Sequence, residues 1–280
     1  MASVIHVDEW ADECTTVTEV EEALIGLRLK RGFVGKRNLR TTVLTHIAWV
    51  PPEWREAATE TLAGLAEQHP SRTLLLFPEP DAEDGIAARA LLECYEVPFT
   101  ERHLCNEVAE LRLQGDRTRA PASIVLPLLL PDLPVFLRWR GRPGFGEEPF
   151  EQLVEIADRL VVDSSEWPDP PADYPRLVEL FDRIGVSDIA WRRTLSWRRT
   201  LAQAWPKLPD RVTGPPAETA LVAGWLRSRA GIEVEIERAD ALPVSGDRDA
   251  SALLSDELDV FGRDPVYEAA VSAGLLADRP

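Results

Sequence analysis

The sequence is poor in the residues on which most metal centres and disulfide scaffolds depend. Its 280 residues include three cysteines (Cys14, Cys94 and Cys105) and four histidines, with no HxxxH or HExxH pattern. An odd number of widely spaced cysteines argues against a disulfide framework or a zinc site. The phosphate-binding patterns GxGxxG and GxxxxGK[ST] and the GxSxG elbow of serine hydrolases are also missing. The sequence therefore predicts neither a cofactor nor a catalytic centre of a familiar kind.

Long apolar runs and positive charge are scarce as well. The longest apolar stretch, residues 124–130, is interrupted by Pro127 and is far shorter than the roughly 20 residues that cross a bilayer. No lysine or arginine precedes Arg28, whereas a secretory signal begins with basic residues, so we expect a cytoplasmic protein. The net charge of −17 disfavours nucleic acids and anionic membranes as partners, because both would repel it.

Segments with strand-like and helix-like patterns alternate along the chain. This order predicts an α/β protein, with a mixed sheet, helices packed on it and a smaller C-terminal α/β domain. Residues 88–97 and 104–113 are predicted to form a hairpin, and residues 123–130 fit either a buried helix or a strand. The expected organisation is an acidic, loosely ordered lead-in (1–16), an N-terminal domain (17–165), a proline-rich linker (166–173) and a C-terminal domain (174–280).

Cys94 and Cys105 lie almost symmetrically about the predicted hairpin turn. Side chains that face each other across two strands can oxidise to a disulfide when they are close enough, which makes the pair a candidate redox site. The interpretation we favour is two small buried hydrophobic side chains that stay reduced in the cytoplasm.

Two segments combine tryptophan with arginine in a chain that is otherwise acidic. Arginine binds carboxylate or phosphate through paired hydrogen bonds, and both residue types are enriched at protein interfaces. These segments are therefore candidate partner-binding or anion-binding sites. The alternative is that the tryptophans fill the core while the arginines cover a helix face. The candidate partner-binding residues are Arg138, Trp139, Arg140, Arg142, Trp191, Arg192, Arg193 and Arg198.

The same segments, with others in a fixed order, resemble a known family. The sequences are His69-Pro70-Ser71-Arg72, Pro131-Asp132-Leu133-Pro134, Arg138-Trp139-Arg140-Gly141, Asp163-Ser164-Ser165 and Asp188-Ile189-Ala190-Trp191. Across roughly residues 16–230 they resemble the OpcA family of glucose-6-phosphate dehydrogenase assembly proteins. The family pattern has tryptophan where Arg138 stands and proline where Ser196 stands. Read without the resemblance, Asp163 and Ser164 fit a polar turn that caps the next segment.

The resemblance implies a non-catalytic protein that binds glucose-6-phosphate dehydrogenase and promotes its active oligomer in the oxidative pentose phosphate pathway. Two alternatives remain open. One is a sugar-phosphate-binding protein or enzyme that holds phosphate with the arginines of residues 138–142 and 192–199. The other is a redox sensor built on Cys94 and Cys105.

Overall fold

The computed structural model describes residues 4–30, 42–65, 69–96, 103–244, 246 and 248–274. Contacts between Cα atoms divide the chain into two compact units, Met1–Asp158 (the N-terminal unit) and Arg159–Pro280 (the C-terminal unit). Residues 30–40 are basic and contain Gly32 and Gly35, which predicts a surface loop, but beyond Lys30 this stretch lies outside the described residues.

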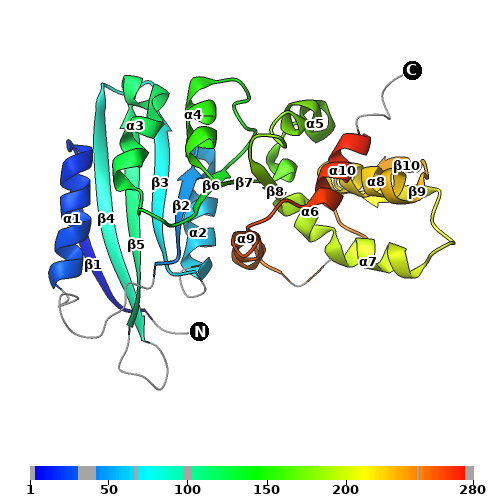
Figure 1. Ribbon diagram of the computed structural model, residues 1–280, viewed down its shortest axis with the longest axis horizontal. Helices are drawn as coiled ribbons and strands as arrows, with labels where there is room; N and C mark the ends of the chain where they lie inside the picture. The colour runs from blue at the N-terminus through cyan, green and yellow to red at the C-terminus, as the bar shows by residue number, and fades with distance from the viewer. Residues whose placement is uncertain are drawn as a thin grey trace. The chain divides into compact units, whose positions relative to one another are not determined.

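A mixed sheet forms the centre of the N-terminal unit (Figure 1). Its strands follow the order β1–β4–β5–β3–β2–β6. Strands β5, β3, β2 and β6 are parallel, whereas β4 runs antiparallel to both β1 and β5, so the expected hairpin and mixed sheet are confirmed. The strands are β1 (Val4–Asp12), β2 (Leu44–Trp49), β3 (Ser71–Glu79), β4 (Gly85–Glu96), β5 (His103–Gln114) and β6 (Val135–Trp139).

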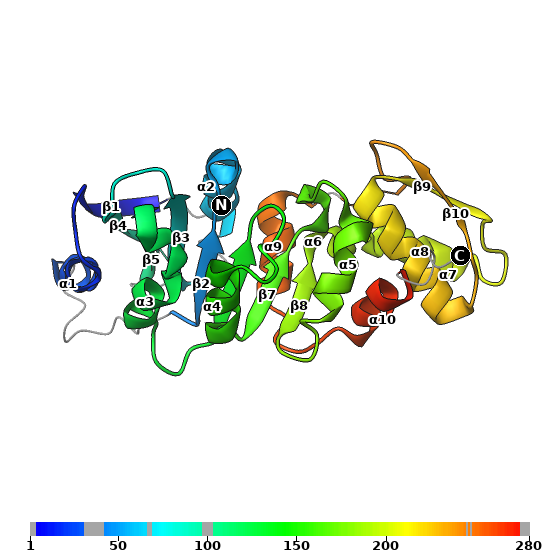
Figure 2. The same cartoon turned by 90° about the horizontal axis from the view of Figure 1, so that it is seen from above.

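Helices cover both faces of this sheet. Figure 2 shows α1, α3 and α4 on one face and α2 on the other. Strand β3 is buried along almost its whole length, as expected for a parallel strand between two helical layers. The helices are α1 (Val17–Lys30), α2 (Arg55–Leu65), α3 (Pro121–Val125) and α4 (Glu148–Ile156), with short 3-10 turns at η1 (Pro52–Trp54), η2 (Gly115–Arg119) and η3 (Leu126–Leu128).

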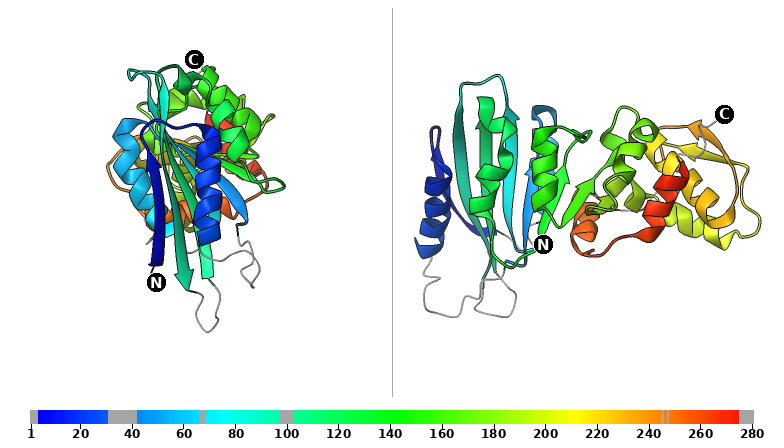
Figure 3. Two further views of the ribbon diagram at one scale, coloured as in Figure 1. Left: turned by 90° about the vertical axis from the view of Figure 1, so that its left-hand side faces the viewer. Right: turned by 45° about the horizontal axis from the view of Figure 1, so that its top comes forward.

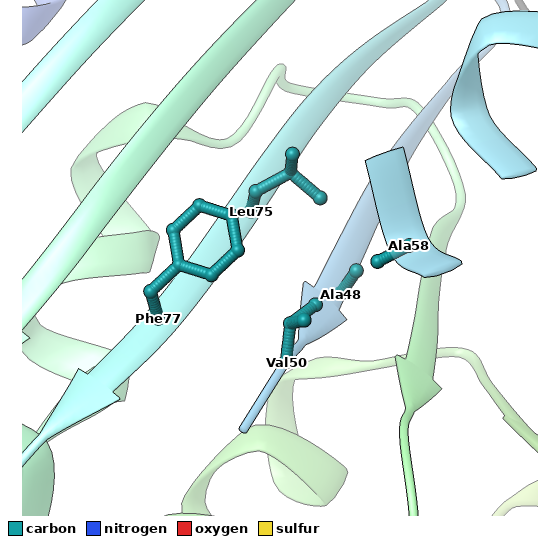
Figure 4. Close-up of a cluster of buried hydrophobic side chains, with 5 residues drawn as sticks. All are labelled: Ala48, Val50, Ala58, Leu75 and Phe77. Atoms are coloured by element: carbon teal, nitrogen blue, oxygen red, sulfur yellow. The ribbon is translucent and has the colours of Figure 1, made fainter. Parts of the chain in front are cut away.

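Alternation along the central strands separates two cores. On one face, Ala48 of β2, Val50 just after β2, and Leu75 and Phe77 of β3 pack with Ala58 of α2 (Figure 4). The intervening residues point to the opposite face, where α1 contributes a stripe of buried apolar side chains. That stripe is formed by Val20, Leu24 and Leu27.

The structure decides the conformation of two segments whose sequence pattern is misleading or ambiguous. The acidic lead-in was expected to be loosely ordered, and this was wrong, because residues 4–12 form β1 and pair with β4. An edge strand tolerates charged side chains, and Glu9 meets Arg89 of β4 at 2.8 Å. The ambiguous segment 123–130 begins as helix, since Pro121 stands at the first helical turn of α3.

The C-terminal unit is smaller and contains two pairs of parallel strands, β7 with β8 and β9 with β10. Residues 170–173, which were expected in the linker, begin helix α5, and prolines at its first turn suit a helix start. In Figure 3, α10 (red) runs beside α8 (yellow-orange). The elements are β7 (Arg159–Val162), η4 (Ser164–Glu166), α5 (Pro170–Val178), β8 (Gly185–Asp188), α6 (Ile189–Arg193), α7 (Leu195–Gln203), β9 (Arg211–Gly214), α8 (Pro216–Ala230), β10 (Glu235–Arg238), α9 (Ala250–Leu258) and α10 (Pro265–Gly274).

Two helical glycines give a matched test of this packing. A Cβ at Gly224 of α8 would overlap the carbonyl oxygen of Ala270 in α10, whereas a Cβ at Gly26 of α1 meets nothing within 4 Å. We expect Gly224→Ala to lower the free energy of unfolding by about 1–3 kcal/mol through overpacking. Gly26→Ala should raise it by about 0.5–1 kcal/mol, because alanine loses less backbone entropy in a helix. Urea unfolding followed by circular dichroism measures both, and equal effects would contradict the α8–α10 packing.

Candidate functional site

The His69–Arg72 segment places a buried charge at the start of β3. The side chain of Arg72 is 1% exposed, and its Nε donates to Glu107 of β5 at 2.7 Å. One terminal nitrogen, Nη1, donates at 2.8 Å to Glu21 of α1 and also at 2.8 Å to the carbonyl oxygen of Leu128 in η3. A single guanidinium therefore connects β3 with β5, α1 and η3.

Parallel register explains this arrangement. Arg72 and Glu107 are direct partners between β3 and β5, so both side chains leave the same face of the sheet. The other oxygen of Glu107 meets Arg28 of α1 at 3.1 Å. Because Arg28 and Arg72 face Glu21 and Glu107, the four charges balance within the network.

Replacing Arg72, the centre of this network, should destabilise the folded protein. We expect Arg72→Met to lower the free energy of unfolding by about 3–5 kcal/mol, since it leaves the carboxylate of Glu107 buried with one cationic partner fewer. The matched control is Arg55→Met, because Arg55 pairs with Glu79 at 3.1 Å while 45% exposed, and such pairs contribute less than about 1 kcal/mol. Chemical denaturation measures both variants. A loss for Arg72→Met no larger than for Arg55→Met would show that the network is not a stabilising centre.

The other residues of the segment lie near a second buried basic group. His69 and Ser71 are buried, and the backbone N–H of Ser71 donates to Asn106 of β5 at 3.0 Å. Burial, and then the charges of Arg138 and His69, lower the pKa of His46 in β2 to about 3. His46 is therefore neutral at pH 7. The two residues beside it, His69 and Arg138, come from two of the motif segments.

In the Arg138–Arg142 segment, neighbouring side chains take opposite faces of the sheet. Trp139 stacks on Trp49 with ring centroids 5.0 Å apart and meets the edge of Phe150 in α4 at the same distance. Arg138 is 2% exposed, and Arg140 lies with its guanidinium 4.9 Å from the ring centre of Trp54. This part of the segment is interior structure.

The end of that segment reaches the surface. Gly141 has φ of +72°, and a Cβ there would approach Trp54 Nε1 to 2.9 Å, so a side chain would be both strained and crowded. The indole N–H of Trp139 donates to the carbonyl oxygen of Arg142 at 3.1 Å. Arg142 itself is exposed and lies 5.8 Å from the ring centre of Phe145.

The turn before β6 holds the remaining N-terminal motif residues. Pro131 and Asp132 are exposed, and Pro134 is half-buried. Asp132 has φ of +63°, a left-handed conformation that aspartate tolerates better than most residues. The carbonyl oxygen of Pro134 accepts from the backbone of Thr45 at 2.9 Å, so the motif fixes the entry into β6.

Cys94 and Cys105 form a disulfide between β4 and β5, with Cα atoms 4.1 Å apart. The interpretation that we favoured, two reduced side chains, is therefore wrong for this structure. The cause is register, because the two cysteines are direct partners in the antiparallel pair and directly opposed side chains lie close together. The third cysteine, Cys14, is free and exposed.

In the C-terminal unit, Arg193 at the end of α6 gathers carboxylates from two other elements. Its Nη2 pairs with Asp163, which follows β7, and donates to Ser165 Oγ at 2.9 Å. Its Nη1 pairs with Glu218 of α8, which is 3% exposed. Burial acts to lower the pKa of Arg193, but Asp163 and Glu218 raise it above its ordinary value, so Arg193 stays charged.

Asp163 and Asp188 lie at the carboxyl ends of the neighbouring parallel strands β7 and β8. Asp163 caps η4 by accepting from the N–H of Ser165, which confirms the expected polar turn. Asp188 caps α6 through Ala190 and accepts from the backbone N–H of the fully buried Ser164 at 3.0 Å. Burial, and then the nearby charge of Asp163, raise the pKa of Asp188 to about 7.

This raised pKa predicts a pH dependence of stability. The folded state holds a proton on Asp188 up to about pH 7, whereas the unfolded chain releases it near pH 4. The contribution of Asp188 is therefore complete below about pH 4 and is lost as the pH rises toward 7, by up to about 1.4 kcal/mol per pH unit.

Asp188→Asn should remove that dependence, because an amide keeps the oxygen that accepts from Ser164 and Ala190 but does not titrate. Unfolding free energies measured at pH 5, 6, 7 and 8 test this, with Asp210→Asn as the control at an exposed position. Parallel pH profiles for the wild type and Asp188→Asn would contradict the assignment.

The Trp191–Arg198 segment is also largely internal. Trp191 is 5% exposed and donates through its indole N–H to Asp264 at 3.0 Å. The guanidinium of Arg198 lies 3.3 Å from the ring centre of Trp191, a close cation–π contact. Arg192 pairs with Glu257 of α9. Trp191, Arg192 and Arg198 thus join α6 and α7 to residues near the C-terminus.

Several residues of these sites were missed by the sequence analysis. The carboxylates Glu107, Glu218, Glu257 and Asp264 come from segments distant from the arginines or tryptophan that they meet. Glu218 carried a usable signal, because it stands two residues before the apolar residues 220–222 in a helix whose start is buried. A buried carboxylate requires a cationic partner, but the sequence does not specify which one.

In both units, arginines of the motif segments are held in internal ion pairs with carboxylates from distant elements. Within the described ranges, no group of three or more His, Cys, Asp or Glu side chains is arranged to hold a metal ion. In the same ranges, no helix combines the length and apolarity needed to span a bilayer.

Comparison with known proteins finds a family that part of the chain resembles. Residues 63–179 match the family described as the glucose-6-phosphate dehydrogenase subunit N-terminal domain. Over this stretch the chain is similar to the family of OpcA assembly proteins. The region contains the His69–Arg72 network, the Arg138–Arg142 segment and the Asp163 cap.

Three relatives carry the name OpcA and are assigned by name to the OxPP cycle. The relative from Nostoc punctiforme is 31% identical over 180 residues, which cover 59% of this chain and 39% of the relative. Those from Synechococcus elongatus and Synechocystis sp. are 29% and 26% identical, covering 60% and 59% of this chain and 41% and 38% of their own length. The chain thus spans about two fifths of the length of these relatives. No solved structure matches it.

Proposed function

We propose that this chain is a non-catalytic cytoplasmic protein that binds glucose-6-phosphate dehydrogenase and favours its active oligomer. The observation that carries the proposal is the match of residues 63–179 to a family described as a subunit domain of that dehydrogenase. A protein that binds one oligomeric form more tightly than the others shifts the population toward that form without any chemistry of its own.

The geometry supports a structural role for most of the family motif. Most of the motif side chains are buried, namely Arg72, Arg138, Trp139, Asp163 and Asp188. Arg72 and Asp163 are also held in internal ion pairs. Side chains buried in this way shape a surface but do not themselves contact a partner. The partner contact is therefore assigned to exposed residues beside the motif.

Arg142 is the exposed arginine of the first tryptophan–arginine segment, and its backbone is anchored by Trp139. An arginine on a rigid loop loses little entropy on binding and can pair with a carboxylate of the partner. Its neighbour Phe145, at 5.8 Å, adds an aromatic surface of the kind enriched at interfaces.

A charge reversal tests this assignment. We expect Arg142→Glu to weaken binding to the dehydrogenase of the same cell by about tenfold or more, since a like charge would replace an attractive pair. Size-exclusion chromatography of the mixture measures complex formation, and dehydrogenase activity at limiting enzyme measures activation. The matched control is Arg119→Glu, a reversal at a residue that is 75% exposed in the same unit.

The outcomes separate the two parts of the proposal. No complex with wild-type protein at about 10 µM would remove the proposed function. A complex that Arg142→Glu and Arg119→Glu weaken equally would retain the partner but reject Arg142 as its contact.

A further inference from the structure

The C-terminal unit contains a cavity of about 390 Å³ whose wall is rich in arginine. It lies among α6, α7, the segment before α9 and α9 itself. In a chain with net charge −17, four arginines and a single carboxylate line it, together with leucines. The charged lining residues are Arg192, Arg193, Arg199, Arg248 and Asp256.

The arginines of the cavity differ in how many of their nitrogen donors already have an acceptor in the protein. Arg193 is held by Asp163 and Glu218 and therefore forms a rigid part of the cavity lining. Arg192 uses Nε for Glu257, which orients its guanidinium and leaves two terminal nitrogens for which the described residues offer no acceptor.

Two further arginines retain donors. Arg199 of α7 is exposed, and no carboxylate among the described residues pairs with it. Arg248 uses Nη2 for Asp256 and for the carbonyl oxygen of Ala252, which leaves Nη1 and Nε. Donors from three separate segments, α6, α7 and residue 248, thus remain available to a ligand.

The positive charges also crowd one another. Beside the cavity, burial lowers the pKa of Arg198 to about 10; Asp264 opposes this shift, whereas the charges of Arg192 and Arg199 add to it. The carboxylates that offset Arg192 and Arg193 lie behind them, since Glu257 and Glu218 are only 5% and 3% exposed. An anion in the cavity would relieve this repulsion from the open side.

We propose that this cavity binds a small phosphate monoester. A phosphate carries about two negative charges and three acceptor oxygens, which matches guanidinium forks converging from several segments. Leu195, Leu242 and Leu253 give the cavity an apolar part against which the carbon body of the ligand packs. The volume falls within the range of small-molecule sites, about 300–1,000 Å³.

Isothermal titration calorimetry with glycerol 3-phosphate tests the proposal on the full chain without any dehydrogenase. The outcome is therefore independent of the proposed function. We expect saturable binding with a Kd of about 1 mM or tighter, and weaker binding of inorganic phosphate, which lacks the carbon body. Glycerol, which lacks the phosphate, should not bind.

Two substitutions locate the ligand. Arg199→Ala and Arg248→Ala should each weaken binding of glycerol 3-phosphate by about tenfold, because each removes a charge-assisted hydrogen bond. The matched control is Arg176→Ala, an arginine 59% exposed in α5 of the same unit, which should leave the affinity unchanged. Thermal melting of each variant checks that it remains folded.

Three results would overturn the proposal. The first is no detectable binding at about 10 mM ligand. The second is binding that Arg199→Ala and Arg248→Ala leave unaltered. The third is a loss in Arg176→Ala equal to theirs, which would indicate a general charge effect and no site at the cavity.

Discussion

In each unit one buried or partly buried arginine meets two carboxylates, and these ion pairs hold elements together that lie far apart in the sequence. In the N-terminal unit Arg72 draws Glu107 and Glu21 to the junction of β3, β5 and α1. In the C-terminal unit Arg193 draws Asp163 and Glu218 to the end of β7 and the start of α8. Each arginine joins elements far apart in sequence, and leaving its carboxylates unpaired would cost more than the pair contributes.

Burial also distinguishes the residues of the motif segments that support the fold from those that lie at the surface. Arg138 and Trp139 lie inside the N-terminal unit and Trp191 inside the C-terminal unit, where they orient loops and helix ends. Arg142 and Arg199, in contrast, are exposed, and the proposed contacts with a partner and with a phosphate involve them. A protein that shifts a partner's equilibrium needs a rigid surface, since flexibility at the contact would consume binding free energy as entropy.

Much of the N-terminal fold could be predicted because its signals are local. The continuous apolar run of residues 73–77 is typical of a strand covered on both faces, and the turn between two strand-like segments indicates the β4–β5 hairpin. Other elements gave no local signal. Strand β1 is acidic and gains its pairing only from β4, and residues 123–130 have a pattern that helix and strand share.

The sequence by itself determined the fold class and the resemblance to the OpcA family, because periodicity, turn residues and ordered motifs are properties of the chain. The pairing of those segments was decided by the tertiary structure. Cys94 and Cys105 meet because of strand register, and Arg193 meets Glu218 because α6 and α8 pack together. The sequence specifies which side chains are charged. Their burial and their partners depend on contacts between residues tens of positions apart, which no local pattern encodes.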